Sequence, residues 1–258
     1  MNLIPKVIHY CWFGNNSFQE SELACLESWR TLLPDFQFRL WNEGSLDLDQ
    51  YPFAKEAYNS GKFAFVSDVV RLHALFYEGG IYLDTDVILI KNLENLLDLS
   101  FFTGEYKPGA LNAAVIGSRA FHPVLKEMLA FYKLQKFDFL KPLTIPEVFD
   151  QFVWGHQEES VRIFPPSYFY PLPLEKKGGD FAEFIKAETY GVHLWNHSWK
   201  DEFVLLRQDE IFKSIKLALH HIKQYPNTYR NKAYLNRYIT LFIRSIKRIL
   251  KSKLQIRG

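Results

Sequence analysis

Short apolar runs alternate with longer segments of helical spacing along the first half of the chain. Apolar runs rich in β-branched and aromatic residues, closed by glycine or polar residues, are typical of core strands. Apolar residues that recur every three or four positions are typical of helices with one buried face. The pattern predicts strands at residues 6–13, 36–41 and 111–117 and helices at residues 21–29, 64–78 and 124–132. We therefore expect an α/β fold.

One predicted strand, residues 79–90, is interrupted by two carboxylates in the order Gly-Gly-Ile-Tyr-Leu-Asp-Thr-Asp-Val-Ile-Leu-Ile. Residues two apart on a strand share a face, so Asp84 and Asp86 can aim at one point. An isolated Asp-x-Asp is more often a solvated turn or a helix cap, but here apolar residues flank both acids, where unpaired charge is costly. Mn²⁺ and Mg²⁺ take oxygen ligands and commonly bind carboxylates together with substrate phosphates. The stretch therefore predicts a metal-diphosphate site.

The helix predicted before this stretch carries an acid and a base three positions apart. Asp68 and Arg71 share one face of that helix. They form either an exposed ion pair of little energetic value, or an acid and a planar donor that grip sugar hydroxyls near the metal site. Trp12, at the end of the first predicted strand, either packs in the core or stands where nucleotides bind in open α/β sheets.

Histidine and tryptophan are concentrated in residues 192–199. The segment is either aromatic core with incidental imidazoles, or it supplies an imidazole ligand to a metal and hydroxyl and indole donors to phosphate oxygens. The candidates for these roles are His193, His197, Ser198 and Trp199.

Composition limits the class of protein. The chain has 258 residues, 48% of them apolar, which is enough to bury the core of one large α/β domain. Cys11 and Cys25 allow at most one disulfide and match no zinc pattern, so a reducing compartment is the simpler expectation. We see no signal-peptide pattern and no apolar run near the roughly 20 residues that span a bilayer. We therefore expect a cytoplasmic protein.

Charge divides the chain into an acidic body and a basic tail. Residues 211–258 hold twelve Lys and Arg and no Asp or Glu, which leaves 19 of the 31 basic residues against all 29 acidic ones before them, a net of −10. We expect a catalytic domain over residues 1–210 and a basic helical extension over residues 211–258. The extension carries an apolar stripe of Leu235, Ile239, Phe242, Ile246 and Ile249.

The stripe and the basic residues around it predict a basic amphipathic helix. Such a helix either lies on an anionic membrane surface, which would make the protein peripheral on the inner face of the cytoplasmic membrane, or docks its stripe on the domain. Aromatic and basic residues here form no recognised nucleic-acid-binding module, so we expect no nucleic-acid partner.

Four motifs together resemble the family-32 glycosyltransferases, the DXD sugar-binding enzymes. The family includes fungal Golgi mannosyltransferases and bacterial capsule and lipopolysaccharide transferases, with the clostridial toxin glucosyltransferase domains as distant relatives. The resemblance covers about residues 4 to 200. The motifs are Ile-Pro-Lys-Val-Ile-His-Tyr-Cys-Trp-Phe-Gly at residues 4–14, Ser-Asp-Val-Val-Arg at 67–71, Gly-Gly-Ile-Tyr-Leu-Asp-Thr-Asp at 79–86 and His-Leu-Trp-Asn-His-Ser-Trp at 193–199.

The resemblance implies a GT-A fold, a Rossmann-like mixed sheet flanked by helices, and sugar transfer with retention of anomeric configuration. It implies Mn²⁺ or Mg²⁺ as cofactor, a nucleotide-diphosphate sugar as donor, UDP-sugars favoured over GDP-sugars, and a glycan or lipid-linked glycan of a surface polysaccharide as acceptor. By resemblance, Trp12 stacks on the base, Asp68 and Arg71 hold the donor sugar, and Asn112 faces that sugar. Asp84 contacts ribose and metal, and Asp86 and His193 bind the metal, with His197 as a competitor of His193. Ser198 and Trp199 bind the diphosphate.

Two other functions remain open at this point. A phosphohydrolase or phosphotransferase of the haloacid-dehalogenase type would use Asp84 as nucleophile, although no Asp-Asp pair follows Asp86 to complete its metal site. A non-catalytic sugar-binding protein of transferase ancestry is the second alternative. A P-loop nucleotide hydrolase is excluded, because no Gly-x-x-x-x-Gly-Lys-Ser/Thr motif occurs.

Overall fold

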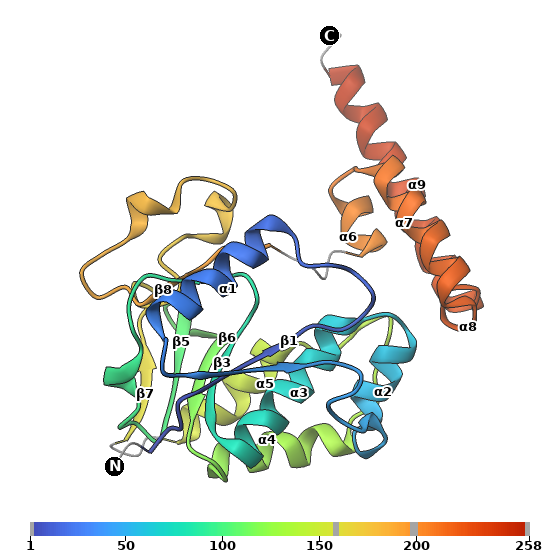
Figure 1. Cartoon of the computed structure of the whole chain (residues 1–258). Coiled ribbons are helices and arrows are strands. Elements are labelled where there is room, and N and C mark those ends of the chain that lie inside the picture. Colours follow the sequence, from blue (N-terminus) through green and yellow to red (C-terminus); the bar gives the residue numbers. More distant parts are fainter. Residues whose placement is uncertain (1–2, 157–159, 197–200, 256–258) are drawn as a thin grey trace. The chain divides into compact units, whose positions relative to one another are not determined.

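In a computed structural model of the chain, six strands form a mixed sheet in the order β2-β1-β3-β6-β5-β7 (Figure 1). The structure describes residues 3–156, 160–196 and 201–255. Strands β2, β1 and β3 are parallel, β6 runs antiparallel to both β3 and β5, and β7 is parallel to β5. The bounds are β1 Val7–Cys11, β2 Gln37–Trp41, β3 Gly80–Leu83, β5 Phe101–Lys107, β6 Ala110–Ser118 and β7 Val161–Phe164. A separate two-stranded sheet pairs β4, Val87–Leu89, with β8, Gly191–His193.

Helices cover both faces of the six-stranded sheet. Alternate side chains of β1 show why: Ile8 and Tyr10 join the apolar cluster around Trp29 of α1, whereas the His9 Nε2–H donates to the backbone oxygen of Gly79, just after α3, at 2.8 Å. Figure 1 shows α1 on one face and α3, α4 and α5 on the other. The bounds are α1 Glu20–Leu32, α2 Pro52–Asn59, α3 Phe63–Glu78, α4 Pro123–Leu134 and α5 Ile145–Phe152.

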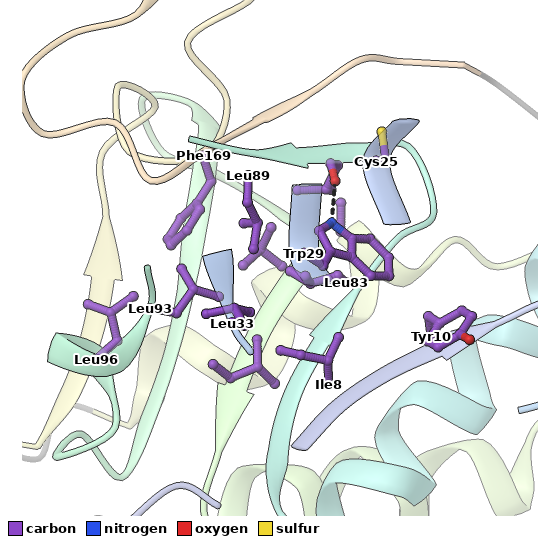
Figure 2. Packing of buried hydrophobic residues seen from close by; sticks show 14 of the residues in the cluster. Ile8, Tyr10, Cys25, Trp29, Leu33, Leu83, Leu89, Leu93, Leu96 and Phe169 are labelled. Atoms are coloured by element: carbon purple, nitrogen blue, oxygen red, sulfur yellow. Dashed lines mark hydrogen bonds between the residues drawn. The ribbon is translucent and has the colours of Figure 1, made fainter. Parts of the chain in front are cut away.

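The core beneath α1 also fixes the start of β4. Figure 2 shows the fully buried indole of Trp29, whose Nε1–H donates to the backbone oxygen of Val87 at 2.7 Å. Leu33, Leu89 and Phe169 pack in the same cluster. Burial of such large side chains contributes about 2 kcal/mol each, so the backbone directly after Asp86 is anchored to the core.

The glycine pair before β3 has a steric reason. Gly80 has φ +115°, and a Cβ there would lie 2.7 Å from the backbone oxygen of Val7 and 3.0 Å from Nε2 of His9. The same His9 Nε2 lies 2.8 Å from the backbone oxygen of Gly79. Only glycine lets β3 approach β1 this closely at the end of α3.

The predicted α/β class, with a mixed sheet flanked by helices, is confirmed. Predicted strands 6–13, 36–41 and 111–117 correspond to β1, β2 and β6, and the predicted helices 21–29, 64–78 and 124–132 to α1, α3 and α4. The prediction of one strand over residues 79–90 is wrong: β3 and β4 belong to different sheets, because a turn separates them at residues 84–86. Strands β5 and β7 and helices α2 and α5 were not predicted.

The chain divides into two units, Met1–Ala57 with Phe63–Asn196 and Tyr58–Lys62 with His197–Gly258. The elements from β1 to β8 build the first unit, except that the last two residues of α2 belong to the second. The second holds a buried carboxylate, Glu202, whose Oε2 lies 3.0 Å from Nδ1 of His221. Among the described residues no helix has the length and apolar character needed to cross a bilayer. The helices of the second unit are α6 Glu202–Arg207, α7 Ile211–Gln224, α8 Pro226–Tyr229 and α9 Lys232–Gln255.

Candidate active site

Asp84 and Asp86 lie in the turn that joins β3 to β4. The Asp84 N–H donates to the backbone oxygen of Ala114 on β6 at 2.8 Å, and the Val87 N–H donates back to the Asp84 oxygen at 3.0 Å. The two acids converge because of this turn, and not because they share a strand face as the sequence suggested. Ligand atoms of Asp84, Asp86 and His193 all lie within 4.8 Å of one another.

Strand pairing brings His193 to this turn. In the β4–β8 ladder His193 is the partner of Val87, and its Nε2 lies 3.2 Å from Oδ1 of Asp86. The Asn196 N–H donates to the other Asp86 oxygen at 2.8 Å. Burial alone would raise the pKa of the Asp86 carboxyl, but His193 and the Asn196 N–H outweigh it and lower the pKa. Asp86 is therefore held as a carboxylate.

The three side chains that meet at this turn fit a divalent cation. Two carboxylates and one imidazole offer the oxygen and nitrogen ligands that such ions take. The Nδ1 atom of His193 is buried and has no hydrogen-bond partner among the described residues, which is costly for a polar atom unless a ligand engages the ring. The cluster of Asp84, Asp86 and His193 is thus a candidate metal centre.

Arg71 links Asp68 to the candidate metal centre. Its Nη2 donates to Oδ1 of Asp68 at 3.0 Å, and its Nη1 lies 3.2 Å from Oδ1 of Asp84. Two further bonds run from Nη1 to the Ala113 oxygen at 2.8 Å and from Nε to the Ser67 oxygen at 3.1 Å. Asp68 and Arg71 are only 6% and 5% exposed, so the reading of an exposed helix-surface pair is wrong.

The Asp68 carboxyl has an unusual pKa. Burial raises it, the Arg71 guanidinium opposes that rise, and the Asp84 charge adds to it, with a resulting pKa of about 7. The backbone N–H of Ile145, at the start of α5, also favours the ionised form. Burial therefore disfavours the ionised form of Asp68, and the Arg71 guanidinium is the charge that stabilises it.

Two other predicted residues lie at strand ends in the first unit. Trp12 follows β1 and is half-buried; its Nε1–H donates to the Asn16 oxygen at 2.6 Å, and its ring lies 4.3 Å from that of Phe18. Asn112 is a half-buried residue of β6 whose Oδ1 accepts from the Ala114 N–H at 2.9 Å. The amide NH₂ of Asn112 is thus the group that could donate to a sugar.

Three predicted residues, His197, Ser198 and Trp199, lie outside the described residues. Of the two histidines considered as metal ligands, His193 is the one whose position is described, and it lies against Asp86. The predicted diphosphate contacts of Ser198 and Trp199 stay predictions.

Two buried tyrosines were not among the site residues predicted from the sequence. Tyr82, two residues before Asp84, is buried; its hydroxyl donates to Asp84 Oδ1 at 2.8 Å, and the Arg71 guanidinium lies 4.5 Å from its ring centre. Tyr170 is buried below β6, where its hydroxyl accepts from the Val115 N–H at 3.2 Å. The spacing of Tyr82 on the strand before Asp84 was a usable signal, whereas Tyr170 lies in an irregular segment with none.

Comparison with known proteins gives two family matches. The family described as "Glycosyltransferase sugar-binding region containing DXD motif" matches residues 19–103, and the one described as "Alpha 1,4-glycosyltransferase conserved region" matches residues 114–221. The first match contains Asp68, Arg71, Asp84 and Asp86, and the second contains His193.

Curated relatives agree with these matches. Lactosylceramide 4-alpha-galactosyltransferase of Rattus norvegicus is 30% identical over 183 residues, which cover 64% of this chain and 48% of that protein. Inositol phosphoceramide mannosyltransferase 3 of Schizosaccharomyces pombe is 32% identical over 130 residues, 49% of this chain and 36% of that protein. The chain thus spans half or less of the length of these relatives.

Among solved structures, the chain is similar to the PaToxG glycosyltransferase, with a TM-score of 0.48 and 21% identity over 59% of this chain and 68% of that one. The structure has the mixed sheet flanked by helices that the resemblance implied. The DXD turn, both family matches and the curated relatives thus agree: the chain is similar to glycosyltransferases that carry the DXD sugar-binding region.

Proposed function

We propose that the protein is a retaining, metal-dependent glycosyltransferase. It moves a hexose or N-acetylhexosamine from a nucleotide-diphosphate sugar, UDP-sugars being favoured over GDP-sugars, to a glycan acceptor. The observation that carries this proposal is the convergence of Asp84, Asp86 and His193 at one turn, with the buried Asp68–Arg71 pair tied to Asp84. A cluster that can hold a cation, joined to a buried acid, suits a donor with both a diphosphate and sugar hydroxyls.

Each residue has a distinct part in the proposal. A Mn²⁺ or Mg²⁺ ion held by Asp84, Asp86 and His193 would neutralise charge on the leaving diphosphate. Arg71 and Tyr82 both hold Oδ1 of Asp84, which keeps that carboxylate oriented before a donor arrives. The remaining roles are Trp12 on the base, Asp68 and Asn112 on sugar hydroxyls, and Ser198 and Trp199 on the diphosphate.

We propose attack on the same face of the sugar that the diphosphate leaves. The acceptor oxygen bonds to the anomeric carbon as the bond to the diphosphate oxygen breaks, and the acceptor proton passes to the departing diphosphate. Asp68 does not suit the part of a covalent nucleophile, because Arg71 holds it. Mass spectrometry of enzyme trapped with a slow donor tests this step, and a glycosyl adduct on a carboxylate would refute it.

The names of the relatives support an acceptor that is carried on a lipid, because they describe transfer to lactosylceramide and to inositol phosphoceramide. We propose that this chain acts on a glycan of a surface polysaccharide, such as capsule, lipopolysaccharide or exopolysaccharide. We also place it in the cytoplasm. Cys11 and Cys25 are both buried and unpaired, which suits a reducing compartment.

Release of nucleoside diphosphate from a panel of UDP- and GDP-sugars with Mn²⁺ tests the proposed activity. One donor should be turned over by the wild type and by Asp35→Asn, an exposed acid used as control, and not by Asp86→Asn. Proton NMR of the released or transferred sugar then reports whether the anomer is retained. No turnover of any donor, with binding preserved, would favour the non-catalytic sugar-binding alternative.

The haloacid-dehalogenase alternative has weak support. Its nucleophile would be Asp84, yet Oδ1 of Asp84 is engaged by the Tyr82 hydroxyl and by Arg71. Hydrolysis of a simple phosphate ester, in the absence of nucleotide-sugar turnover, would reverse this preference.

A further inference from the structure

Helix α9 packs within the second unit through one face. Tyr234 and Ser245 are buried on this face, and the Ser245 hydroxyl donates to Oδ1 of Asp209 at 2.7 Å. The guanidinium of Arg248 donates to the same carboxylate at 2.6 Å and to the Leu206 oxygen at 2.7 Å. These contacts fix how α9 is rotated about its own axis.

A second face of α9 carries an exposed aliphatic row. Its members recur every three or four residues and therefore share one side of the helix. At about 100° per residue, the row is turned by about 130° from the buried face. The row consists of Leu235, Ile239, Ile243, Ile246 and Leu250, which are 38%, 54%, 46%, 36% and 55% exposed.

The row differs from the stripe expected from the sequence. Phe242 and Ile249, members of that stripe, are half-buried, whereas Ile243 and Leu250 are exposed. The packing of α9 inside its own unit therefore leaves an aliphatic row uncovered. Uncovered aliphatic rows of this length are uncommon on soluble proteins and mark binding surfaces.

A third face of α9 is basic. Arg244, Lys247 and Lys251 are exposed and recur at helical spacing, and they begin about 40° round the helix from Ile243, so they border one edge of the aliphatic row. No acidic residue occurs anywhere from residue 211 to residue 258. The aliphatic row is thus bordered by positive charge that no acidic side chain of this segment neutralises.

We propose that this face of α9, the aliphatic row with its basic border, docks on the surface of an anionic lipid bilayer. The aliphatic side chains would enter the acyl boundary while the basic ones remain at the headgroups, as in helices that lie in the membrane interface. A second copy of the chain is a poorer occupant, because two such faces would bring their basic borders together. The inference concerns the second unit alone and does not depend on the proposed chemistry.

Co-sedimentation of the full chain with vesicles tests the proposal without any substrate. We expect binding to phosphatidylcholine vesicles that contain about one quarter phosphatidylglycerol, weak binding to phosphatidylcholine alone, and loss of binding as salt is raised. Replacing Arg244, Lys247 and Lys251 by Gln should weaken binding on the order of 100-fold, at about fivefold per basic residue. Replacing exposed Lys176 and Lys177 by Gln is the matched control and should leave binding within about twofold.

The aliphatic row needs its own variants. Ile239→Glu with Ile243→Glu should abolish vesicle binding, whereas Leu134→Glu, at an 84% exposed leucine of α4, should not. Circular dichroism and light scattering check that both variants fold and report their oligomeric state. Binding that persists in Ile239→Glu/Ile243→Glu, or equal binding to neutral and anionic vesicles, overturns the proposal. A wild-type dimer that becomes monomeric in this variant would overturn it in favour of self-association.

Discussion

Replacing Arg71 by lysine should destabilise the protein although it keeps the positive charge. The guanidinium serves four acceptors at once: the carboxylates of Asp68 and Asp84 and the backbone oxygens of Ser67 and Ala113. A lysine ammonium is a single point with three donors and cannot reach the same set from a flexible stem. With three donors for four acceptors, at least one acceptor would therefore lose its partner.

Each buried acceptor left unsatisfied costs about 1–3 kcal/mol. We therefore expect Arg71→Lys to lower the free energy of unfolding by about 1–3 kcal/mol. Arg71→Met should cost about 3–5 kcal/mol, because it also leaves a buried carboxylate without its counter-charge. The double variant Asp68→Asn/Arg71→Met should be more stable than Arg71→Met alone, since the uncompensated carboxyl group is gone.

Urea unfolding followed by tryptophan fluorescence and circular dichroism measures these differences. The matched control is Arg39→Lys, whose partner Glu78 lies 3.0 Å away in a pair with 51% and 29% exposed side chains. That surface pair should change stability by less than about 1 kcal/mol. If Arg71→Lys is as stable as Arg39→Lys, the guanidinium does not hold the site together as argued.

Three further changes test separate parts of the account. Tyr82→Phe removes the hydroxyl that orients Asp84, so Mn²⁺-dependent donor binding, measured by calorimetry, should weaken about tenfold or more. The metal-free variant should still be folded and should unfold cooperatively. His122 is fully buried, and burial lowers its pKa to about 4. Its contribution to stability is therefore fully present above the unfolded-state pKa of about 6.5 and is lost as the pH falls toward 4, because the unfolded chain then binds a proton that the folded protein does not. From pH 7 to pH 5 the wild type should lose about 2 kcal/mol that His122→Asn, which can still cap α4, does not lose. Gly80→Ala should lower the melting temperature clearly more than Gly109→Ala, because a Cβ meets nothing within 4 Å at Gly109 and a backbone oxygen at 2.7 Å at Gly80; equal melting temperatures would contradict the steric argument.

The local patterns of the sequence were sufficient for β1, β2, β6, α1, α3 and α4, because the strands contain short apolar runs and the helices repeat apolar residues every three or four positions. Strand β5 was missed for a physical reason. Its Gly104 accommodates the Tyr170 ring, 2.9 Å from where a Cβ would stand, and its last residues are polar and partly exposed, so no apolar alternation marks it.

The candidate site was predictable in its residues and less so in its geometry. Asp84 and Asp86 stood out because they interrupt an apolar run, but their convergence depends on a turn between two sheets. The contact of His193 with Asp86 depends on the register of β4 against β8, which no local pattern fixes. The backbone oxygen of Ala113, a partner of Arg71, has no sequence signal at all.

The most direct test of the central claim is a thermal-shift measurement with nucleotide sugars, with and without Mn²⁺, on the wild type and Asp86→Asn. A ligand at about 100 times its dissociation constant stabilises the folded state by about 2.7 kcal/mol. For the first unit this corresponds to a rise of roughly 5–10 °C in melting temperature. We predict such a rise with one UDP- or GDP-sugar only when Mn²⁺ is present, and none in Asp86→Asn. An equal rise without metal, or in Asp86→Asn, would contradict a metal-diphosphate site at Asp84, Asp86 and His193.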